Sequence, residues 1–328
     1  PSKIMGTNLG NHLMIRKINL TSQQSLNTII KALKEMTDDF FDIDWPRIME
    51  QLVVNVSKYK GGNFESIKIG NIPVVNEEKH YVFPFIRKNA INIIYGAGGS
   101  GKSYLSVFLG LLVQSGKSYA GLNPDQGNVL YLDWESEEQD LNERLKGIKE
   151  GMAIAHPSIK ETEFLYYRCK DKFVNEEDTI ADMIVENDIK LIIVDSFGGA
   201  LAGEINDADA SMQLANSLRS LGVTILGIDH VSKGNSDSPI GTVYKVNLAR
   251  NLWSVNSRLD EIKNEMEVVL KHTKTNNKKE NPRVYNIKFH LNEEAFGITE
   301  KVEIVSLSND QSTILESIIN SEQEEQYG

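Results

Sequence analysis

The stretch Ile91-Asn-Ile-Ile-Tyr-Gly-Ala-Gly-Gly-Ser-Gly-Lys-Ser103 decides the fold. Ile91–Tyr95 is a short apolar run typical of a buried strand, and Ser103–Gln114 has the character of a helix that ends before Gly116. Between them, Gly96–Ser103 matches the pattern G-x-x-x-x-G-K-[ST] in full. A strand, a glycine-rich turn and a helix in this order predict a phosphate-binding loop, because successive backbone N–H groups and the helix N-terminus cradle a polyphosphate. The alternative is a glycine-rich turn with an incidental lysine.

The loop residues have expected roles with ATP and Mg²⁺. Glycines lack the Cβ atoms that would obstruct the approach of phosphates to the backbone. We expect Lys102 to reach the β- and γ-phosphates and the Ser103 hydroxyl to ligate Mg²⁺. The expected nucleotide contacts of this segment are Gly96, Ala97, Gly98, Gly99, Ser100, Gly101, Lys102, Ser103 and Tyr104.

Two acidic residues follow other predicted strands. Leu191–Asp195 is an apolar strand ending in an acid, and we expect Asp195 to hold Mg²⁺ at the carboxyl end of a parallel sheet, usually through a water. Glu135 follows the strand Val129–Asp133, which we expect to neighbour the strand before the phosphate loop. There Glu135 would orient and deprotonate the attacking water, while Asp133 would support the sheet end or the metal shell. Alternatively, Glu135 is a first-turn helix acid favoured by the helix dipole.

A histidine ends the next strand, Thr224–Asp229. His230 is a candidate contact for the γ-phosphate, with Asp229 fixing its tautomer, and the alternative is a structural histidine. The following segment, Val231–Ile240, is rich in Gly, Ser, Asn and Asp and contains Lys233. It is predicted to be a mobile loop, which faces a central channel if the protein forms a ring and is otherwise a simple surface loop.

These residues, in this order, resemble the RecA-like ATPases typified by the plasmid replicative helicase RepA, over about residues 80–305. The matching segments are Tyr131–Glu135, Asp195-Ser196, His230–Lys233, and Gly241-Thr242 followed nine residues after the glycine by Arg250. The resemblance implies a ring-shaped hexamer on single-stranded DNA, in which Arg250 is an arginine finger that reaches the γ-phosphate held by the neighbouring subunit. The alternative is that Arg250 is an ordinary surface or salt-bridge arginine. The resemblance also implies that Lys274, near Asn276, contacts the nucleotide. Thr242 stands where relatives have serine, and the channel loop is poor in basic residues.

The expected fold class is α/β, a RecA-like core with a mainly parallel central sheet and a small helical N-terminal extension. Four predicted strands after residue 250 are expected to pair antiparallel at one edge: Leu252–Val255, Met266–His272, Val284–His290 and Gly297–Ile304. Residues 1–80 would form the extension or linker, with a flexible lead over 1–20, a helix capped by Thr21 and a second helix from Asp44. Residues 81–307 would be the ATPase domain, in which Ser136 and Gln139 form a capping box. Residues 308–328 would be a helix and tail, either the start of a truncated domain or a frayed terminus.

Composition narrows the class of protein. The chain has 328 residues, a formal net charge of −11 and one cysteine, Cys169, which excludes an internal disulfide framework and fits a cytoplasmic setting. No apolar run reaches membrane-spanning length. The acidic balance counts against attraction of DNA by the overall electrostatic field, so a DNA contact needs a local basic surface.

The acidic charge leaves open a RecA-fold regulatory ATPase as the alternative to a helicase. A small-molecule kinase ranks third, because no arginine-rich lid segment lies between Asp195 and Thr224.

Overall fold

The computed structural model describes residues 2–8, 11–18, 23–37, 43–60, 79–203, 207–232, 235–239, 249–275, 279–292 and 299–307. The chain divides into two compact units, Pro1–Asn76 and Glu77–Gly328. Some predictions lie outside the described residues, namely the roles of Thr21, Lys233, Gly241-Thr242 and Asn276 and the helix and tail of residues 308–328.

The first unit begins with a strand pair, where a flexible lead was expected. Strands β1 (Ser2–Asn8) and β2 (Asn11–Ile18) pair antiparallel, with Met5 opposite Ile15. The prediction was wrong because a hairpin satisfies the backbone polar groups of two short runs that carry little helical periodicity. The signal that could have revealed it is Gly10, which separates two such runs.

Two helices complete this unit, as the apolar periodicity predicted. They are α1 (Gln23–Thr37) and α2 (Trp45–Lys60), and their shared core consists of Ile29, Leu33 and Met49. Asp44 precedes α2, and its Oδ1 accepts a hydrogen bond from the backbone N–H of Arg47 (3.2 Å). This side chain therefore satisfies one of the first turn's unpaired donors, as expected for a residue that starts a helix.

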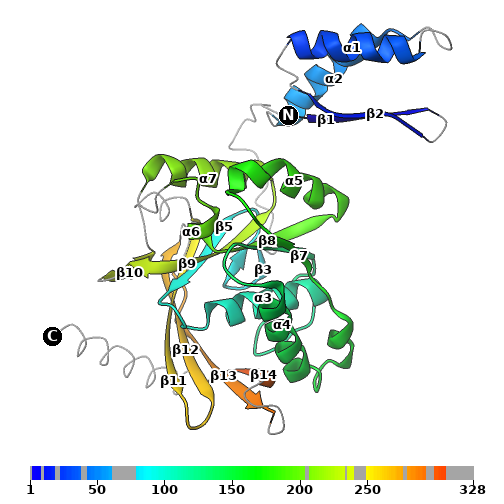
Figure 1. Cartoon of the computed structure of the whole chain (residues 1–328). Coiled ribbons are helices and arrows are strands. Elements are labelled where there is room, and N and C mark those ends of the chain that lie inside the picture. The colour runs from blue at the N-terminus through cyan, green and yellow to red at the C-terminus, as the bar shows by residue number, and fades with distance from the viewer. Residues whose placement is uncertain are drawn as a thin grey trace, which may run out of the picture. The chain divides into compact units, whose positions relative to one another are not determined.

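The second unit is built on a ten-stranded sheet with the order β14-β13-β12-β11-β5-β9-β8-β6-β7, to which β10 adds beside β9 (Figure 1). The strands are β5 (Ile91–Gly96), β6 (Asn128–Asp133), β7 (Leu165–Arg168), β8 (Ile189–Asp195), β9 (Thr224–Ser232), β10 (Asn235–Pro239), β11 (Asn251–Asp260), β12 (Glu265–Thr275), β13 (Arg283–Leu291) and β14 (Thr299–Ser306). Short strands β3 (His80–Val82) and β4 (Ile86–Arg87) pair separately. The parallel centre and the antiparallel edge agree with the predicted fold class.

The antiparallel set of four strands is confirmed: β11 pairs antiparallel with β12, and its other edge pairs parallel with β5, which joins the set to the parallel centre. One detail of the predicted topology was wrong. Strand β6 was expected next to β5, but β9 and β8 lie between them. Strand order depends on which crossover helices cover each face, and periodicity within one strand carries no information about it. All these parallel strands still end at one edge of the sheet, so the polar residues that follow them converge there.

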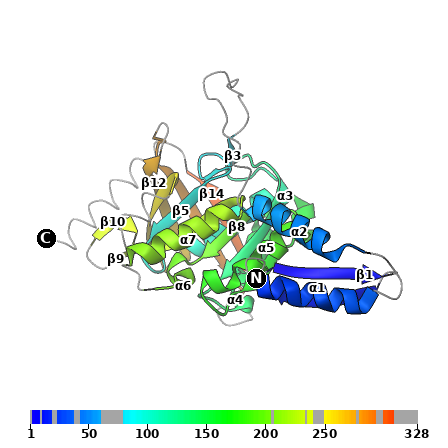
Figure 2. The ribbon, with the colours of Figure 1, turned by 90° about the horizontal axis from the view of Figure 1, so that it is seen from above.

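Helices cover both faces of this sheet. Figures 1 and 2 show α5 (Phe173–Glu186) and α7 (Ala208–Ser220) across one face, while α3 (Lys102–Ser115) and α4 (Glu138–Met152) lie on the other. Side chains alternate accordingly along β8, where Leu191 and Ile193 join the α3 side and Ile192 and Val194 the α5 side. Strands buried on both faces are continuously apolar, which is why these runs could be recognised in the sequence.

Two short helices complete the unit, the 3₁₀ helix η1 (Pro157–Glu161) and α6 (Phe197–Ala200). Among the described residues, no helix combines the length and apolar character needed to cross a bilayer.

Candidate active site

The glycine-rich loop joins β5 to α3 at the carboxyl edge of the sheet, as predicted. Gly99 and Gly101 have φ angles of 73° and 86°, a region that side chains with a Cβ rarely adopt. A Cβ on Gly96 would collide with the carbonyl oxygen of Val255, whereas the space above Gly98 and Gly99 is open. The loop therefore presents bare backbone on its outer side. Gly101 caps α3 without any side-chain hydrogen bond, so the helix N-terminus stays available to an anion.

Lys102 folds back over this loop. Its Nζ donates to the carbonyl oxygens of Gly96 (3.0 Å) and Ala97 (2.6 Å), and its side chain is buried. Burial lowers the pKa of Lys102, and the nearby carboxylates of Asp195, Glu135 and Asp229 partly oppose this by raising it. The Lys102 ammonium therefore lies near three carboxylates. Binding of a polyphosphate and a metal ion would rearrange these charged groups.

The loop fits ATP with Mg²⁺ on two further observations. The Oγ of Ser100 is buried and has no hydrogen-bond partner among the described residues, so a group that binds the loop can supply one. Ser103 is the second residue of α3 and lies in its first turn, where the expected Mg²⁺ ligand must stand. Tyr104 follows it and meets Phe289 of β13 edge to face, at 5.1 Å between ring centroids, so this expected contact residue borders the loop.

Asp195 ends β8 and is buried at the same edge of the sheet. Tyr131 of β6 donates from its hydroxyl to Oδ2 of Asp195 (2.7 Å), and the Oγ of Ser106 on α3 lies 3.3 Å from the same hydroxyl. Burial raises the pKa of Asp195, although the hydrogen bond from Tyr131 opposes this. A buried carboxylate with a free oxygen lone pair is a good ligand for a hard cation, because the cation replaces lost solvation.

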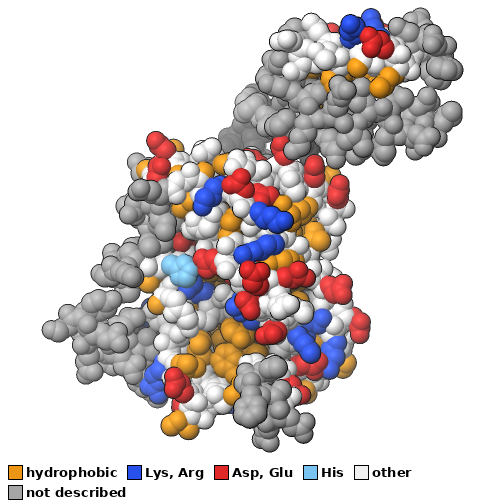
Figure 3. Space-filling model, in the orientation of Figure 1, with side chains coloured by type: hydrophobic (Ala, Val, Ile, Leu, Met, Phe, Trp, Pro, Cys, Tyr) orange, Lys and Arg blue, Asp and Glu red, His pale blue; other side chains and the backbone are white. Residues whose placement is uncertain are grey.

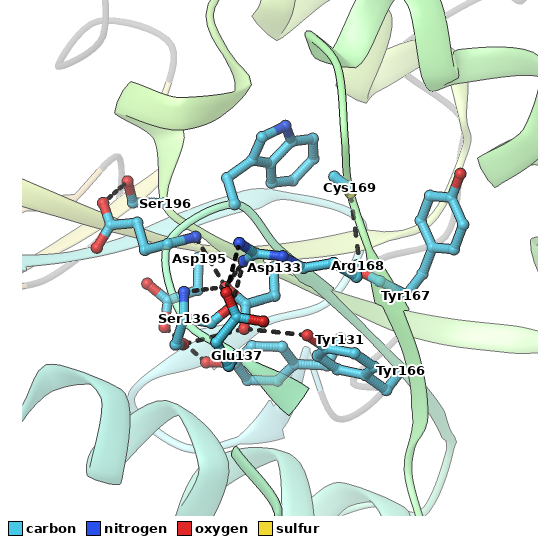
Figure 4. A network of polar contacts seen from close by, with 12 residues as sticks. Tyr131, Asp133, Ser136, Glu137, Tyr166, Tyr167, Arg168, Cys169, Asp195 and Ser196 are labelled. Carbon is cyan, nitrogen blue, oxygen red and sulfur yellow. Dashed lines mark hydrogen bonds and ion pairs between the residues drawn. The ribbon is translucent and has the colours of Figure 1, made fainter. Parts of the chain in front are cut away.

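Asp133 organises the turn that follows β6 (Figure 4). Its Oδ1 accepts hydrogen bonds from the backbone N–H groups of Glu135 (2.9 Å) and Ser136 (2.9 Å), and its Oδ2 accepts one from the Ser136 hydroxyl (3.0 Å). Arg168 of β7 lies 3.6 Å from Oδ1. The predicted capping box of Ser136 and Gln139 was therefore wrong: α4 starts at Glu138 without a side-chain cap, because the Ser136 hydroxyl is already bound to Asp133. Asp133 supports the sheet end, one of its two expected roles.

Glu135 projects from this turn into the site. Ser196, the residue after Asp195, donates its hydroxyl to Oε1 of Glu135. Nε2 of His230 lies 3.4 Å from Oε2 of the same carboxylate. The backbone N–H of Trp134 also donates to the carbonyl of Asp195 (2.7 Å), which ties the two strand ends together. The carboxylate of Glu135 is thus held between β8 and β9 and remains partly exposed to solvent.

His230 stands where β9 reaches the site, as predicted. Its ring faces Glu135, and the contact seen with Asp229 involves the backbone N–H of His230, which donates to Oδ1 of Asp229 (3.0 Å). Glu135, Asp195, His230 and Lys102 therefore meet at one edge of the sheet. The expected roles of these residues in hydrolysis stay predictions.

Arg250 and Lys274 lie at the opposite edge. The backbone N–H of Arg250 donates to the carbonyl of Ile91 (2.9 Å), at the start of β5, whereas the phosphate loop follows its end. Five residues at about 3.3 Å each place Arg250 roughly 16 Å from Gly96 along the strand. Lys274 of β12 lies opposite Leu252 of β11. Burial lowers the pKa of Lys274, and the charge of Arg250 lowers it further. Neither side chain belongs to the phosphate site of its own chain.

A family model described as an AAA domain matches residues 71–236, about half of the chain. The chain belongs to the AAA domain family. This AAA domain protein is a P-loop ATPase built on a mixed sheet with a parallel centre, and proteins of this class typically bind ATP with Mg²⁺. It is similar to a KaiC-like protein from the hyperthermophilic archaeon Pyrococcus horikoshii OT3, at 13% identity and a TM-score of 0.49, over 70% of this chain and 94% of the other. No curated protein matches the sequence.

Three residues contact the acidic side chains of the AAA domain site, and these contacts were not predicted from the sequence. They are Tyr131, Ser196 and Arg168, which hold Asp195, Glu135 and Asp133 respectively. A polar side chain inside an apolar strand, such as Tyr131 in Val-Leu-Tyr-Leu-Asp133, is the available signal. Its partner becomes apparent only when β6 and β8 are known to be neighbours, with Asp133 opposite Asp195.

Charge on the visible face is mixed. Figure 3 shows acidic and basic side chains interspersed over the described surface of the AAA domain, next to an apolar area, without a continuous basic band on this face. A nucleic acid would therefore have to be bound by a small local cluster of basic groups on this face.

Proposed function

We propose that the protein is an ATP-hydrolysing motor that works as a ring of copies, most simply a RepA-like DNA helicase or replication ATPase. The observation that supports the proposal is the division of the expected catalytic residues between two edges of one sheet. Glu135, His230 and Lys102 lie at the carboxyl edge, whereas Arg250 and Lys274 lie at the amino edge. A second copy that places its amino edge against the first copy's phosphate loop would complete the site.

In this arrangement each residue has a defined task. The bare backbone at Gly98 and Gly99 and the start of α3 bind the phosphates, and Lys102 leaves its carbonyl partners to contact them. Ser103 and Asp195 would hold Mg²⁺, which would supply positive charge to the phosphate oxygens. Glu135 accepts a proton from the attacking water, while His230 reports through its contact with Glu135 whether the γ-phosphate is present. Arg250 of a neighbouring copy stabilises the charge of the transition state.

Mixing two inactive variants tests the shared site. Lys102→Ala should abolish hydrolysis, because the loop loses its phosphate cation, and Arg250→Ala should abolish it if the arginine acts in trans. In an equimolar ring, about a quarter of the interfaces pair an intact phosphate loop with an intact Arg250, so the mixture should regain about a quarter of wild-type activity. A mixture that stays inactive, with rings shown to form, would count against a site shared between copies.

DNA separates the helicase proposal from its alternative. A helicase of this type should show ATP hydrolysis stimulated by single-stranded DNA and should separate a forked duplex. The net charge of −11 favours the second candidate, a regulatory ATPase in which ATP controls assembly or a partner. ATP-dependent oligomerisation without strand separation or DNA stimulation would select that candidate.

A further inference from the structure

A cavity of about 220 Å³ lies at the amino edge of the sheet, away from the phosphate loop. The residues that line it belong to β3, β4 and their connection, to β11 and β12, and to the segments before β11 and β13: His80, Phe83, Pro84, Arg87, Arg250, Asn251, His272, Thr275 and Glu280. One water needs about 10–15 Å³ of such volume, so the cavity has room for a phosphate and for the organic group that carries it.

One wall of the cavity is fixed by buried hydrogen bonds. The side-chain amide of Asn251 donates to the carbonyl oxygens of Pro84 (3.0 Å) and Phe85 (2.7 Å), which joins β11 to the β3–β4 connection. Oδ1 of Asn251 accepts from the indole N–H of Trp253 (3.0 Å), and Trp253 packs against Phe85. These contacts hold the lining in place before any ligand arrives, which lowers the ordering cost of binding.

The lining is basic although the chain is acidic. Arg87 and Arg250 both line the cavity, and among the described lining residues Glu280 is the single acid. The guanidinium of Arg250 has no ion pair within the part of the chain that the structure describes. Lys274 lies close enough for Arg250 to lower its pKa, after burial as the larger cause. Two neighbouring cations disfavour each other, and an anion between them relieves that repulsion.

His272 adds a donor without a partner. Its ring stacks on Trp253 at 4.4 Å between centroids, and its Nδ1 accepts a hydrogen bond from the backbone N–H of Glu280 (3.0 Å). In the neutral ring the proton therefore resides on Nε2, which is buried and makes no hydrogen bond of good geometry among the described groups. The backbone carbonyl of Lys274 lies near enough to the ring to raise its pKa, although burial, the larger cause, lowers it. A buried N–H without an acceptor is costly, and a ligand oxygen would satisfy it.

The opposite side of the lining is aromatic. His80 and Phe83 meet edge to face at 5.1 Å, and Phe83 is 45% exposed. An exposed aromatic face beside arginines suits a ligand that joins a flat ring to a phosphate.

We propose that this cavity binds a nucleotide, with its phosphate held by Arg87, Arg250 and Nε2–H of His272 and its base against Phe83. Two sources of such a ligand exist: a free nucleotide, or the ATP held by the phosphate loop of a neighbouring copy. The second source rests on the proposed ring, whereas the first does not.

Binding of adenosine monophosphate to the Lys102→Ala protein tests the free source. The lysine change weakens the phosphate loop, and the titration is done at a concentration where sedimentation shows a monomer. We expect one bound molecule, about ten- to hundredfold weaker binding of adenosine, which lacks the phosphate, and a similar loss in the Lys102→Ala/Arg87→Gln protein. Lys102→Ala/Arg258→Ala is the matched control, because Arg258 pairs with Glu267 far along β11.

ATP hydrolysis by the assembled protein tests the other source. His272→Phe keeps a ring stacked on Trp253 and removes Nε2–H, so it should lower kcat about tenfold, while Arg258→Ala should not. Circular dichroism and thermal unfolding confirm that each variant is folded. Binding of the monophosphate identifies a free nucleotide as ligand even if the mixed-variant experiment fails. Loss of kcat without such binding identifies the neighbour's ATP. Folded variants that change neither quantity would overturn the proposal.

Discussion

Ser196 should set the rate of hydrolysis without contacting the nucleotide. Its hydroxyl donates to Oε1 of Glu135, and the Ser196 side chain is only 1% exposed, so Ser196→Ala removes one hydrogen bond with little other change. A hydrogen bond to a charged group contributes about 1.5–3 kcal/mol. The side chain of Glu135 is 43% exposed, so water replaces part of this bond and the lower limit applies. A loss of about 1.4 kcal/mol in the transition state corresponds to roughly tenfold in kcat.

The assay is steady-state ATP hydrolysis with nucleotide affinity measured in parallel. We expect kcat to fall about tenfold in Ser196→Ala, while the affinity for ATP stays within about twofold, because the backbone of the phosphate loop is untouched. Ser196→Thr keeps a hydroxyl at the same position and should recover most of the rate. The reasoning is refuted if Ser196→Ala retains wild-type kcat, or if the threonine variant is as slow as the alanine variant.

Four further outcomes follow from the structure. Glu135→Gln should bind ATP normally and lose turnover by at least about a hundredfold, as nucleotide binding and phosphate release would show, and an active variant would mean that the base lies elsewhere. Tyr131→Phe should lower the free energy of unfolding by about 1–3 kcal/mol in urea titrations, because buried Asp195 loses the hydroxyl that donates to it at 2.7 Å; an unchanged midpoint would contradict this. Gly151→Ala should cost about 1–3 kcal/mol in the same assay, since its Cβ would collide with the backbone carbonyl of Val302, and full stability would show that α4 can shift away from β14. Burial raises the pKa of Cys169 to about 12, so the thiol stays protonated as pH rises from 7 to 10 and iodoacetamide should react slowly with the folded protein; fast alkylation near pH 9 without unfolding would disprove the burial.

The phosphate loop and the strand ends could be predicted because their chemistry is local. Gly96–Ser103 requires a strand before it and a helix after it, and both are visible as apolar runs in the sequence. Asp195 and Glu135 follow the carboxyl ends of parallel strands, so they share an edge of the sheet whatever the strand order. The prediction therefore placed Glu135 near Lys102 even though it gave β6 the wrong neighbour.

Hydrogen bonds between distant segments could not be predicted in the same way. Ser136 and Gln139 have the spacing of a capping box, but Asp133 competes for the Ser136 hydroxyl and is closer in the folded turn. Residues 1–20 were given no structure because each run is short, and only pairing of two runs stabilises a strand. Both errors arise where the deciding partner lies elsewhere in the chain.

The register of β5 and β11 determines which edge of the sheet Arg250 occupies. These strands run parallel, so a residue before β11 must lie at the edge opposite the residues that follow β5. Arg250 precedes β11 and Gly96 ends β5, and no change of side-chain rotamer covers the roughly 16 Å between those edges. An arginine that serves the phosphate loop from this position must therefore serve the loop of another copy. The cavity beside Arg250 gives the amino edge a second proposed role, because its basic lining suits a nucleotide bound by a single chain. Whether loss of Arg250 affects nucleotide binding by the monomer or only hydrolysis by the ring distinguishes these two uses of the edge.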